Sequence, residues 1–391
     1  MQTLQIDRDC LQERLPDMID LLKTLVNIDS GSLDVEGVNA VGSVLADRLT
    51  HAGFAMRSRE LPEAERGTML IAEKRGAGTG KLLILGHLDT VWPKGTVSEW
   101  PFQVLENGLA TGPGVGDMKG GLVMALNVLE LLAKQNFKAL ALIKWVLVPD
   151  EELGSVGSRP LIEEEAKGMD VVLVLEPGRA GGGMVTARGA LGVYFIRAKG
   201  CSAHCANNYS KGASAVRELA VKVAPLDNLS NPDTGNIVNV GVFRGGTAKQ
   251  VIPGDAFLNI DLRARTQDQA ECLHRAIFNI AQERIDTRVD VTVEGGLTRP
   301  AYPGAEKNQT LMRAMQAMAE ELSIPVFEAP LVSGGSDGNF TAVMGLPTLD
   351  GLGPVSHDIC SRNETMEIKS LVERGALLCG LIKQLPSLIK Q

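Results

Sequence analysis

Residues 84–93 read ILGHLDTVWP, an apolar run that ends in a histidine, with an aspartate two positions later. Two further apolar runs, 140–148 and 171–175, are nearly continuous, which is typical of strands buried on both faces of a sheet. Between the first two runs, residues 117–136 (DMKGGLVMALNVLELLAKQN) place apolar side chains at helical spacing. Buried strands that alternate with helices predict an α/β unit whose central sheet is flanked by helices.

A different pattern begins near residue 189. Six elements follow in the order β-α-β-β-α-β, the ferredoxin-like arrangement of an α+β unit. In the third strand, one face carries Asn259, Asp261 and Arg263 and the other carries leucine and isoleucine, so we expect this sheet to be half exposed. The expected strands are 191–198, 236–243, 256–263 and 288–294, and the expected helices are 212–224 and 267–284.

Helical patterns return after this segment, at about 308–322 and 367–388. A chain of 391 residues also exceeds what one hydrophobic core usually serves. We therefore expect two compact units, with the second inserted into the first. The predicted boundaries are 1–187 and 300–391 for the first unit, and 188–299 for the inserted unit.

Charge and cysteine content restrict the function. A formal net charge of −8, without a basic stripe, argues against a nucleic-acid partner. The N-terminal segment has acids where a signal peptide needs a basic flank, and no later stretch is long enough to span a bilayer. The six cysteines are few and scattered, which suits reduced thiols. A cytoplasmic protein without a membrane partner is therefore expected.

Acidic and imidazole side chains follow the predicted strands. In an open α/β sheet, the loops beyond the carboxyl ends of the strands converge on one edge. Many carboxylates at one edge repel one another, and a bound cation is the simplest compensation. Mixed imidazole and carboxylate ligands suit Zn²⁺, with Co²⁺ or Mn²⁺ as alternatives. The side chains expected at this edge are His87, Asp89, Asp117, Glu151, Glu152 and Glu176.

The spacing of His87 and Asp89 suggests a role for the aspartate. Two residues apart in an extended chain, both side chains point the same way, so Asp89 can accept the free ring N–H of a metal-bound His87. A surface turn would explain this pair alone, and solvation would explain the acidic pair Glu151–Glu152 alone. Their joint occurrence at successive strand ends favours the metal site.

Five motifs and a late histidine are distributed over the whole chain: GHLDTV (86–91), GPGVGDMKGG (112–121), PDEELGS (149–155), LEP (175–177) and SGGSDGNF (333–340). Together they resemble the M20 family of dinuclear zinc amidohydrolases, closest to its glutamate carboxypeptidase branch. The resemblance implies a zinc-exopeptidase-like catalytic domain with a mixed central sheet. It also implies an inserted ferredoxin-like dimerisation or lid domain, and hence a homodimer.

The same resemblance implies a ligand set for two Zn²⁺ ions per chain. His87 and Glu176 would bind one ion, Glu152 and His357 would bind the other, and Asp117 would bridge them. His357 departs from the usual pattern of the family because an aspartate follows it in GLGPVSHDICSRNE (351–364). A buried structural histidine is the alternative for this position.

The resemblance also assigns catalytic roles outside the ligand set. Glu151 would be the general base, taking a proton from a metal-bound water and passing it to the leaving nitrogen. His204, in GCSAHCANNYS (200–210), would reach the active site of the partner subunit and donate to the oxyanion. The alternative for His204 is a separate metal or redox site with Cys201 and Cys205.

Substrate recognition follows from the same comparison of motifs. Arg263 and Arg299, an asparagine at Asn239 and the backbone of Gly334 and Gly335 would hold the carboxylate end of the substrate. An arginine fork matches a carboxylate well. A salt bridge between the two units is the alternative role for both arginines.

The function expected from the sequence is hydrolysis of an amide next to a free carboxylate. The substrate would be a small peptide, with release of a C-terminal glutamate or a similar residue. One alternative is an N-acyl amino-acid deacylase of the acetylornithine deacetylase or aminoacylase type. Others are a non-catalytic metal-binding homologue and a redox protein that uses Cys201 and Cys205.

Overall fold

A computed structural model describes residues 2–62, 66–302, 304–329 and 331–389, and the chain divides into two units. One unit comprises Met1–Thr186, Gly304–Pro330 and Ser336–Gln391, and the other comprises Ala187–Pro303 and Leu331–Gly335. The second unit therefore extends beyond the predicted range of 188–299. The added segments belong to it because Arg188 forms β-bridges with Tyr302 and with Val332.

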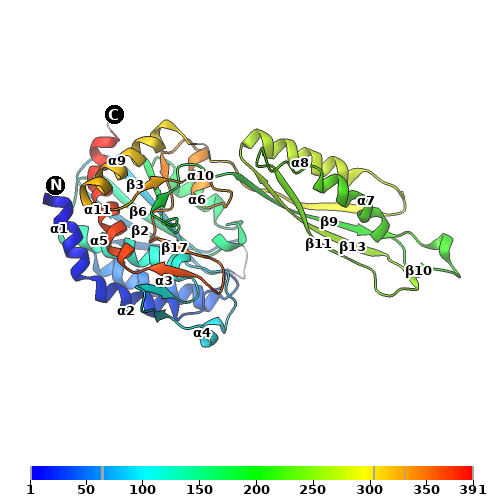
Figure 1. The fold of residues 1–391 in the computed structure, drawn as a ribbon, viewed down its shortest axis with the longest axis horizontal. Helices are drawn as coiled ribbons and strands as arrows, with labels where there is room; N and C mark the ends of the chain where they lie inside the picture. Colours follow the sequence, from blue (N-terminus) through cyan, green and yellow to red (C-terminus); the bar gives the residue numbers. More distant parts are fainter. Residues whose placement is uncertain (1, 63–65, 303, 330, 390–391) are drawn as a thin grey trace. The chain divides into compact units, whose positions relative to one another are not determined.

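The central sheet of the first unit is mixed (Figure 1). Its strands lie in the order β1-β2-β6-β3-β7-β16. Strands β6, β3, β7 and β16 are parallel, whereas β2 runs antiparallel to β6, and β1 to β2. The predicted strands and the mixed sheet are confirmed. The bounds are β1 Ala55–Arg59, β2 Met69–Arg75, β3 Lys81–His87, β6 Leu142–Val148, β7 Val171–Val174 and β16 Thr348–Leu349.

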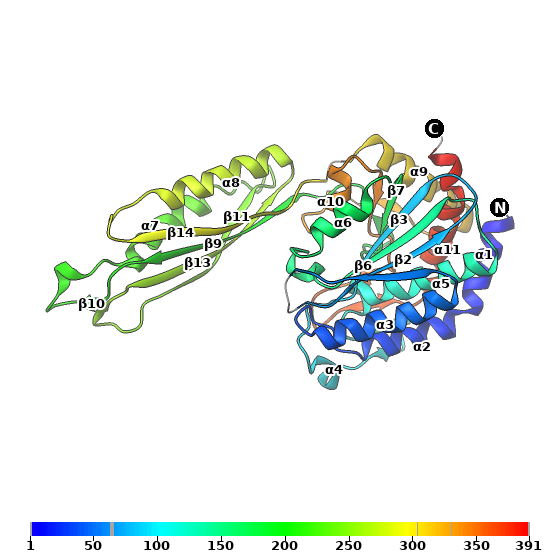
Figure 2. The ribbon, with the colours of Figure 1, turned by 180° about the vertical axis from the view of Figure 1, so that it is seen from behind.

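Alternate residues of β3 point into two different cores. Leu82 and Ile84 pack with one group of helices, and Leu83 and Leu85 pack with α6 and α10. Helices lie on both faces of the sheet (Figures 1 and 2). Each fully buried side chain of this kind contributes about 1.5–3 kcal/mol, which explains the continuous apolar run. The helices are α1 Gln2–Glu13, α2 Leu15–Val26, α3 Val35–His51, α5 Gly121–Lys134, α6 Arg159–Ala166, α9 Glu306–Leu322, α10 Gly338–Val343 and α11 Lys369–Leu388.

The second unit has a four-stranded antiparallel sheet in the order β11-β13-β9-β14. Together with two helices this is the predicted ferredoxin-like arrangement. Leu258, Ile260 and Leu262 pack under the helices, while the opposite face of β13 is partly exposed. Helix α8 begins with a capping box between Thr266 and Gln269. The bounds are β9 Ala190–Lys199, α7 Ala215–Asp227, β11 Ile237–Gly245, β13 Asp255–Ala264, α8 Gln267–Gln282 and β14 Asp290–Arg299.

Short elements of the first unit lie around the ends of the central strands. The η1 turn (Val115–Gly120) precedes α5, and η2 (Glu151–Leu153) follows β6. A small sheet in the order β17-β18-β5-β4 joins the η1 region to the C-terminal part of the chain. Its strands are β4 Gln103–Val104, β5 Leu109–Thr111, β17 Ser356–His357 and β18 Thr365–Glu367.

The remaining elements are also short. In the first unit they are α4 (Thr96–Glu99) and the parallel pair β8 (Gly183–Met184) and β15 (Phe327–Glu328). In the second they are β10 (Ala203–His204), its antiparallel partner β12 (Val251–Ile252) and η3 (Tyr209–Lys211). None of the helices in the described ranges has the length and apolar character needed to cross a membrane.

Candidate metal centre

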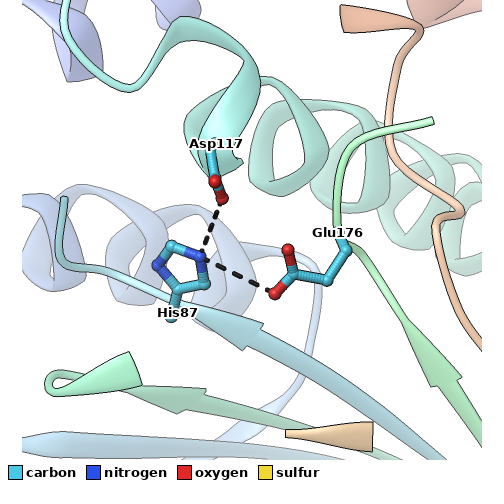
Figure 3. A group of neighbouring side chains, drawn as sticks. All are labelled: His87, Asp117 and Glu176. Carbon is cyan, nitrogen blue, oxygen red and sulfur yellow. Dashed lines mark hydrogen bonds and ion pairs between the residues drawn. The ribbon is translucent and has the colours of Figure 1, made fainter. Parts of the chain in front are cut away.

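His87, Asp117 and Glu176 come from three different segments and point toward one another (Figure 3). His87 ends β3, Asp117 lies in η1 and Glu176 follows β7. Nε2 of His87 lies 3.1 Å from Oδ1 of Asp117 and 3.9 Å from Oε1 of Glu176. All three residues are buried. We call them the His87 group, and their ligand atoms, all within 4.8 Å of one another, could hold a metal ion.

The ring of His87 is oriented by Asp89. Nδ1 of His87 lies 2.9 Å from the backbone oxygen of Asp89 and 3.4 Å from its Oδ1. A proton on Nδ1 that is donated to this carbonyl leaves Nε2 as the ligand atom. The contact predicted between the ring and Asp89 is thus made mainly by the backbone carbonyl, not by the carboxylate.

The carboxylate of Asp89 holds the turn that carries Glu151 and Glu152. Its Oδ1 accepts the backbone N–H of Glu151 at 3.1 Å, and its Oδ2 accepts that of Glu152 at 3.1 Å. Oδ2 also accepts the hydroxyl of Ser32 at 2.6 Å. One buried carboxylate therefore connects the end of β3 to the end of β6. Ser32 is not predictable from the sequence, because no motif marks this serine.

A second group shares Asp117 with the first. It consists of Asp117, Glu152 and Cys360, and we call it the Cys360 group; its ligand atoms also lie within 4.8 Å of one another. The thiol of Cys360 donates to Oδ2 of Asp117 at 3.3 Å, while Oδ1 of Asp117 faces His87. Asp117 therefore directs one oxygen to each group, which is the arrangement that a bridging ligand requires.

His357, expected to be a ligand of the second ion, lies outside both groups in the part of the chain that the structure describes. It sits on β17, where its Nε2 lies 3.2 Å from Oε1 of Glu367. The chain then turns through Asp358 and Cys360, both with positive φ, and the thiol of Cys360 reaches Asp117. The expected role of His357 as a ligand stays a prediction, while the pairing of β17 with β18 brings its imidazole to Glu367.

Glu364 supports the backbone of η1. Its Oε1 accepts the N–H of Gly116 at 2.8 Å and that of Asp117 at 3.1 Å. The residue is fully buried, and burial followed by the charge of Asp117 raises the pKa of Glu364 to about 7. The role of Glu364 is not predictable from the sequence, since an acid in a predicted loop carries no signal of burial.

The carboxylates of the site repel one another. Burial, and then the charge of Asp117, raise the pKa of both Glu152 and Glu176 well above its ordinary value. The charge of Glu151 acts in the same direction on the pKa of Glu176, so the expected base lies close to the ligands. Burial alone would lower the pKa of His87, but its hydrogen bonds to Asp117 and Asp89 outweigh burial and raise it.

These residues fit a pair of divalent cations. Oε1 of Glu152 is buried and has no hydrogen-bond partner among the described residues. A buried carboxylate oxygen without a donor is costly unless a cation lies beside it. Cations would also relieve the repulsion that raises the pKa of Glu152 and Glu176.

His204, one of the predicted catalytic residues, lies in the second unit. It is exposed on β10, and its Nδ1 accepts the backbone N–H groups of Ala206 at 3.2 Å and Asn207 at 3.3 Å. The neutral ring therefore carries its proton on Nε2. Cys201 and Cys205 are exposed free thiols, and with His204 they form no group that could hold a metal ion in the described ranges.

Four predicted substrate-binding residues are close together within the second unit. Arg188 donates to the carbonyl oxygens of Gly334 at 3.0 Å and Gly335 at 3.3 Å, and a Cβ on Gly335 would lie 2.3 Å from Cδ of Arg299. Arg263 donates to the carbonyl oxygen of Ser333 at 3.1 Å. Two arginines thus donate hydrogen bonds to the loop 333–335, and Arg299 packs closely against it.

Arg263 and Asp261 lie on β13, and Asn239 lies on the neighbouring strand β11. Nε and Nη2 of Arg263 donate to the two carboxylate oxygens of Asp261 at 2.7 and 2.8 Å. Asn239 is the register partner of Asp261 across β11 and β13. The arginine fork is therefore paired within its own unit, which differs from the salt bridge between units that was considered as an alternative.

A cavity of about 680 Å³ in the first unit has Glu152 in its wall. Leu33, Val91 and Trp92 contribute apolar surface to it, and Lys94 contributes a cationic side chain. Its volume lies within the range of about 300–1,000 Å³ that is typical of small-molecule sites. A small substrate could therefore lie beside the Cys360 group.

The chain is similar to known proteins in sequence and in fold. The sequence profile of peptidase family M20/M25/M40 matches residues 83–384. The chain is 30% identical to carboxypeptidase G2 of Pseudomonas sp. (strain RS-16), with 95% of this chain and 89% of that protein covered. It is 25% identical to a succinyl-diaminopimelate desuccinylase of Thioalkalivibrio sulfidiphilus (strain HL-EbGR7), with 95% of this chain and 99% of that protein covered. The structure of a tripeptidase from Staphylococcus aureus subsp. aureus mu50 is similar, with a TM-score of 0.77 and 22% sequence identity. The similarity covers 96% of this chain and 99% of that one.

Proposed function

The chain belongs to peptidase family M20/M25/M40, and on this premise we propose that it is a dinuclear zinc hydrolase. The reaction is cleavage of an amide bond next to a free carboxylate, with release of a C-terminal glutamate or a similar residue. One observation supports the dinuclear site above all. The two oxygens of Asp117 face two different ligand groups, the His87 group and the Cys360 group.

The residues of the chain divide the work of the reaction. His87, Asp117, Glu152 and Glu176 hold the ions. Two zinc ions held in this way would lower the pKa of a shared water and polarise the carbonyl of the amide. Glu151 takes the proton of the water and delivers it to the leaving nitrogen. The hydrogen bond from its backbone N–H to Asp89 fixes the segment that carries it.

We further propose that the protein acts as a homodimer through its inserted unit. His204 supports this proposal because it is exposed, and because its Nδ1 accepts two backbone N–H groups. Nε2–H is then the available donor, and it would stabilise the oxyanion formed in the active site of the partner subunit.

The loop 333–335 and Asn239 are proposed to bind the substrate carboxylate. The backbone N–H groups of Gly334 and Gly335 and the side-chain amide of Asn239 would be the donors. Arg299 packs against Gly335, and Arg263 donates to the carbonyl oxygen of Ser333, so both arginines support the shape of this loop.

A second candidate is an N-acyl amino-acid deacylase. It is favoured by the similarity to a succinyl-diaminopimelate desuccinylase over 95% of the chain. The apolar part of the cavity beside Glu152, with Leu33, Val91 and Trp92, would suit an acyl group as well as a peptide side chain. The two candidates differ in the group on the nitrogen side of the cleaved amide, and both need the carboxylate.

A substrate panel separates these candidates. The protein is incubated with an acyl-glutamate, an N-acetyl amino acid and a dipeptide, before chelation, after chelation and after zinc is added back. The proposal predicts release of glutamate that stops on chelation and returns with zinc. Turnover of N-acetyl amino acids alone would favour the deacylase, and absence of turnover of every glutamyl amide would exclude the glutamate carboxypeptidase.

A further inference from the structure

Cys360 lies in a turn between β17 and β18 that projects its sulfur toward Asp117. Both Asp358 and Cys360 have positive φ, at 50° and 60°, so the backbone reverses sharply after His357. The sulfur of Cys360 lies 3.3 Å from Oδ2 of Asp117, whereas Nε2 of His357 lies beside Glu367. The local fold therefore presents a thiol where an imidazole was expected.

Glu152 provides an independent indication of a cation at this position. Its Oε1 is buried without a hydrogen-bond partner in the described ranges, and a carboxylate oxygen of Glu152 lies within 4.8 Å of the ligand atoms of Asp117 and Cys360. Two carboxylates and a sulfur atom thus surround one point. The hydrogen bond from the thiol to Asp117 cannot satisfy Glu152.

We propose that Cys360, and not His357, completes the second metal site, together with Asp117 and Glu152. This inference deepens the proposed dinuclear function and rests on it. The thiol binds as a thiolate, and its proton is released to solvent when the ion binds. Three protein ligands leave a position open for the water that attacks the amide.

A thiolate makes the two metal sites chemically different. The His87 group offers imidazole and carboxylates, whereas the Cys360 group offers a soft sulfur with two carboxylates. Thiolate ligands favour Zn²⁺, and also Co²⁺ and Cd²⁺, over the harder Mn²⁺ and Mg²⁺. The Cys360 group should therefore discriminate against Mn²⁺ more strongly than the His87 group.

Cobalt spectroscopy tests the proposal without relying on activity. The full-length protein is chelated, reloaded with Co²⁺ and compared with Cys360→Ser, His357→Ala and Cys272→Ser, the last being an exposed cysteine of the second unit. The wild type, His357→Ala and Cys272→Ser should show the near-ultraviolet thiolate-to-cobalt band, and Cys360→Ser should lose it. A band that persists in Cys360→Ser, or that is missing from the wild type loaded with two Co²⁺ ions, would overturn the proposal.

Alkylation provides a second test that uses the unaltered protein. Cys360 is an exposed residue, as are Cys201, Cys205 and Cys272, but its sulfur faces Asp117. Iodoacetamide labelling mapped by mass spectrometry should show that Zn²⁺ strongly protects Cys360 and leaves the other three thiols equally reactive. Equal labelling of Cys360 with and without Zn²⁺, in a protein that binds two Zn²⁺ ions, would overturn the proposal.

The metal content distinguishes failure of this inference from failure of the proposed function. If His357→Ala loses one of two bound Zn²⁺ ions and Cys360→Ser keeps both, the ligand assignment is wrong and the dinuclear hydrolase stands. If the wild type binds no Zn²⁺ and chelation leaves hydrolysis unchanged, the proposed function itself fails. Far-ultraviolet circular dichroism of each variant shows whether a lost ion reflects a lost ligand or a lost fold.

Discussion

The carboxylate of Asp89 accepts the backbone N–H of Glu152, with 3.1 Å between Oδ2 and the nitrogen. Oδ1 of Asp89 accepts the N–H of Glu151, and the backbone carbonyl of Asp89 contacts the ring of His87. One residue thus sets the relative positions of three groups: the proposed ligand Glu152, the proposed base Glu151 and the imidazole of His87, which is also a proposed ligand. Asp89 is a positioning residue, since it acts through the groups that it holds.

Asp89→Asn should weaken the site although it preserves the size of the side chain. An amide offers one acceptor oxygen and an NH₂ group, so one of the two backbone N–H groups of Glu151 and Glu152 loses its acceptor. The expected loss is about 10- to 100-fold in zinc affinity or kcat/KM. Zinc titration and kinetics measure it, with the exposed Asp20 of α2 changed to Asn as the matched control. Wild-type values in Asp89→Asn would contradict the positioning role.

Glu151→Gln should abolish turnover and leave both ions bound. The amide cannot accept the proton of the attacking water, and loss of a general base typically lowers kcat by about 10²- to 10⁴-fold. Glu13→Gln, an exposed acid at the end of α1, is the matched control and should have wild-type kinetics. Full activity of Glu151→Gln would show that Glu151 is not the general base and that another residue has this role.

Adjacent glycines of the loop 333–335 should respond differently to alanine. A Cβ on Gly335 would lie 2.3 Å from Cδ of Arg299, whereas the nearest atom to a Cβ on Gly334 is 3.9 Å away. Gly335→Ala should cost about 1–3 kcal/mol of stability, as overpacking generally does, and should raise KM for carboxylate substrates. Gly334→Ala is the control for stability only, because Gly334 is itself a proposed donor to the substrate. Thermal unfolding compares the two changes, and steady-state kinetics measures KM for Gly335→Ala. Equal effects of the two changes would contradict the packing of Arg299 on Gly335.

Removal of the metal should make stability fall as the pH rises. The pKa values of Glu152 and Glu176 in the folded chelated protein lie well above their ordinary value of 4.5, so the native state binds more protons than the unfolded state above that pH. Their stabilising effect is present below about pH 4.5 and is lost as the pH rises through the folded pKa values. The raised pKa of His87 likewise makes the stability fall as the pH rises above 6.5, the ordinary pKa of this group.

Thermal unfolding between about pH 5 and pH 8 measures this dependence. The chelated protein should lose stability across the range, and addition of Zn²⁺ should restore more of it at the upper end, where the ligands are deprotonated. The pKa of Asp117 is lowered, so this residue changes the pH dependence of stability only below its ordinary pKa of 3.8, which is outside the measured pH range. A chelated protein that becomes more stable toward pH 8 would contradict the repulsion between these carboxylates.

The sequence was sufficient to predict the elements that depend on local periodicity. The continuous apolar runs at β3, β6 and β7 predicted buried strands, because both faces of the sheet are covered by helices. The alternation in β13 predicted a half-exposed sheet. The side chains that follow the strand ends were predicted to meet, and His87, Asp117 and Glu176 do lie together.

The details that depend on loop geometry could not be predicted. The contact of the Cys360 thiol with Asp117 depends on a turn with two positive φ angles, which the residue types Asp358 and Cys360 do not signal. The roles of Ser32 and Glu364 depend on hydrogen bonds to backbone groups distant in sequence, at Asp89 and at Gly116. A periodic pattern contains no information about such contacts.

The central claim is that Asp117 is shared by two metal ions. Zinc titration of the chelated protein, followed by elemental analysis, tests it most directly when wild type and Asp117→Ala are compared. A shared Asp117 predicts two Zn²⁺ ions per wild-type chain and a marked loss of both from Asp117→Ala, with the fold retained. A wild-type chain that binds fewer than two ions, or an Asp117→Ala chain that binds two as tightly as wild type, would contradict it.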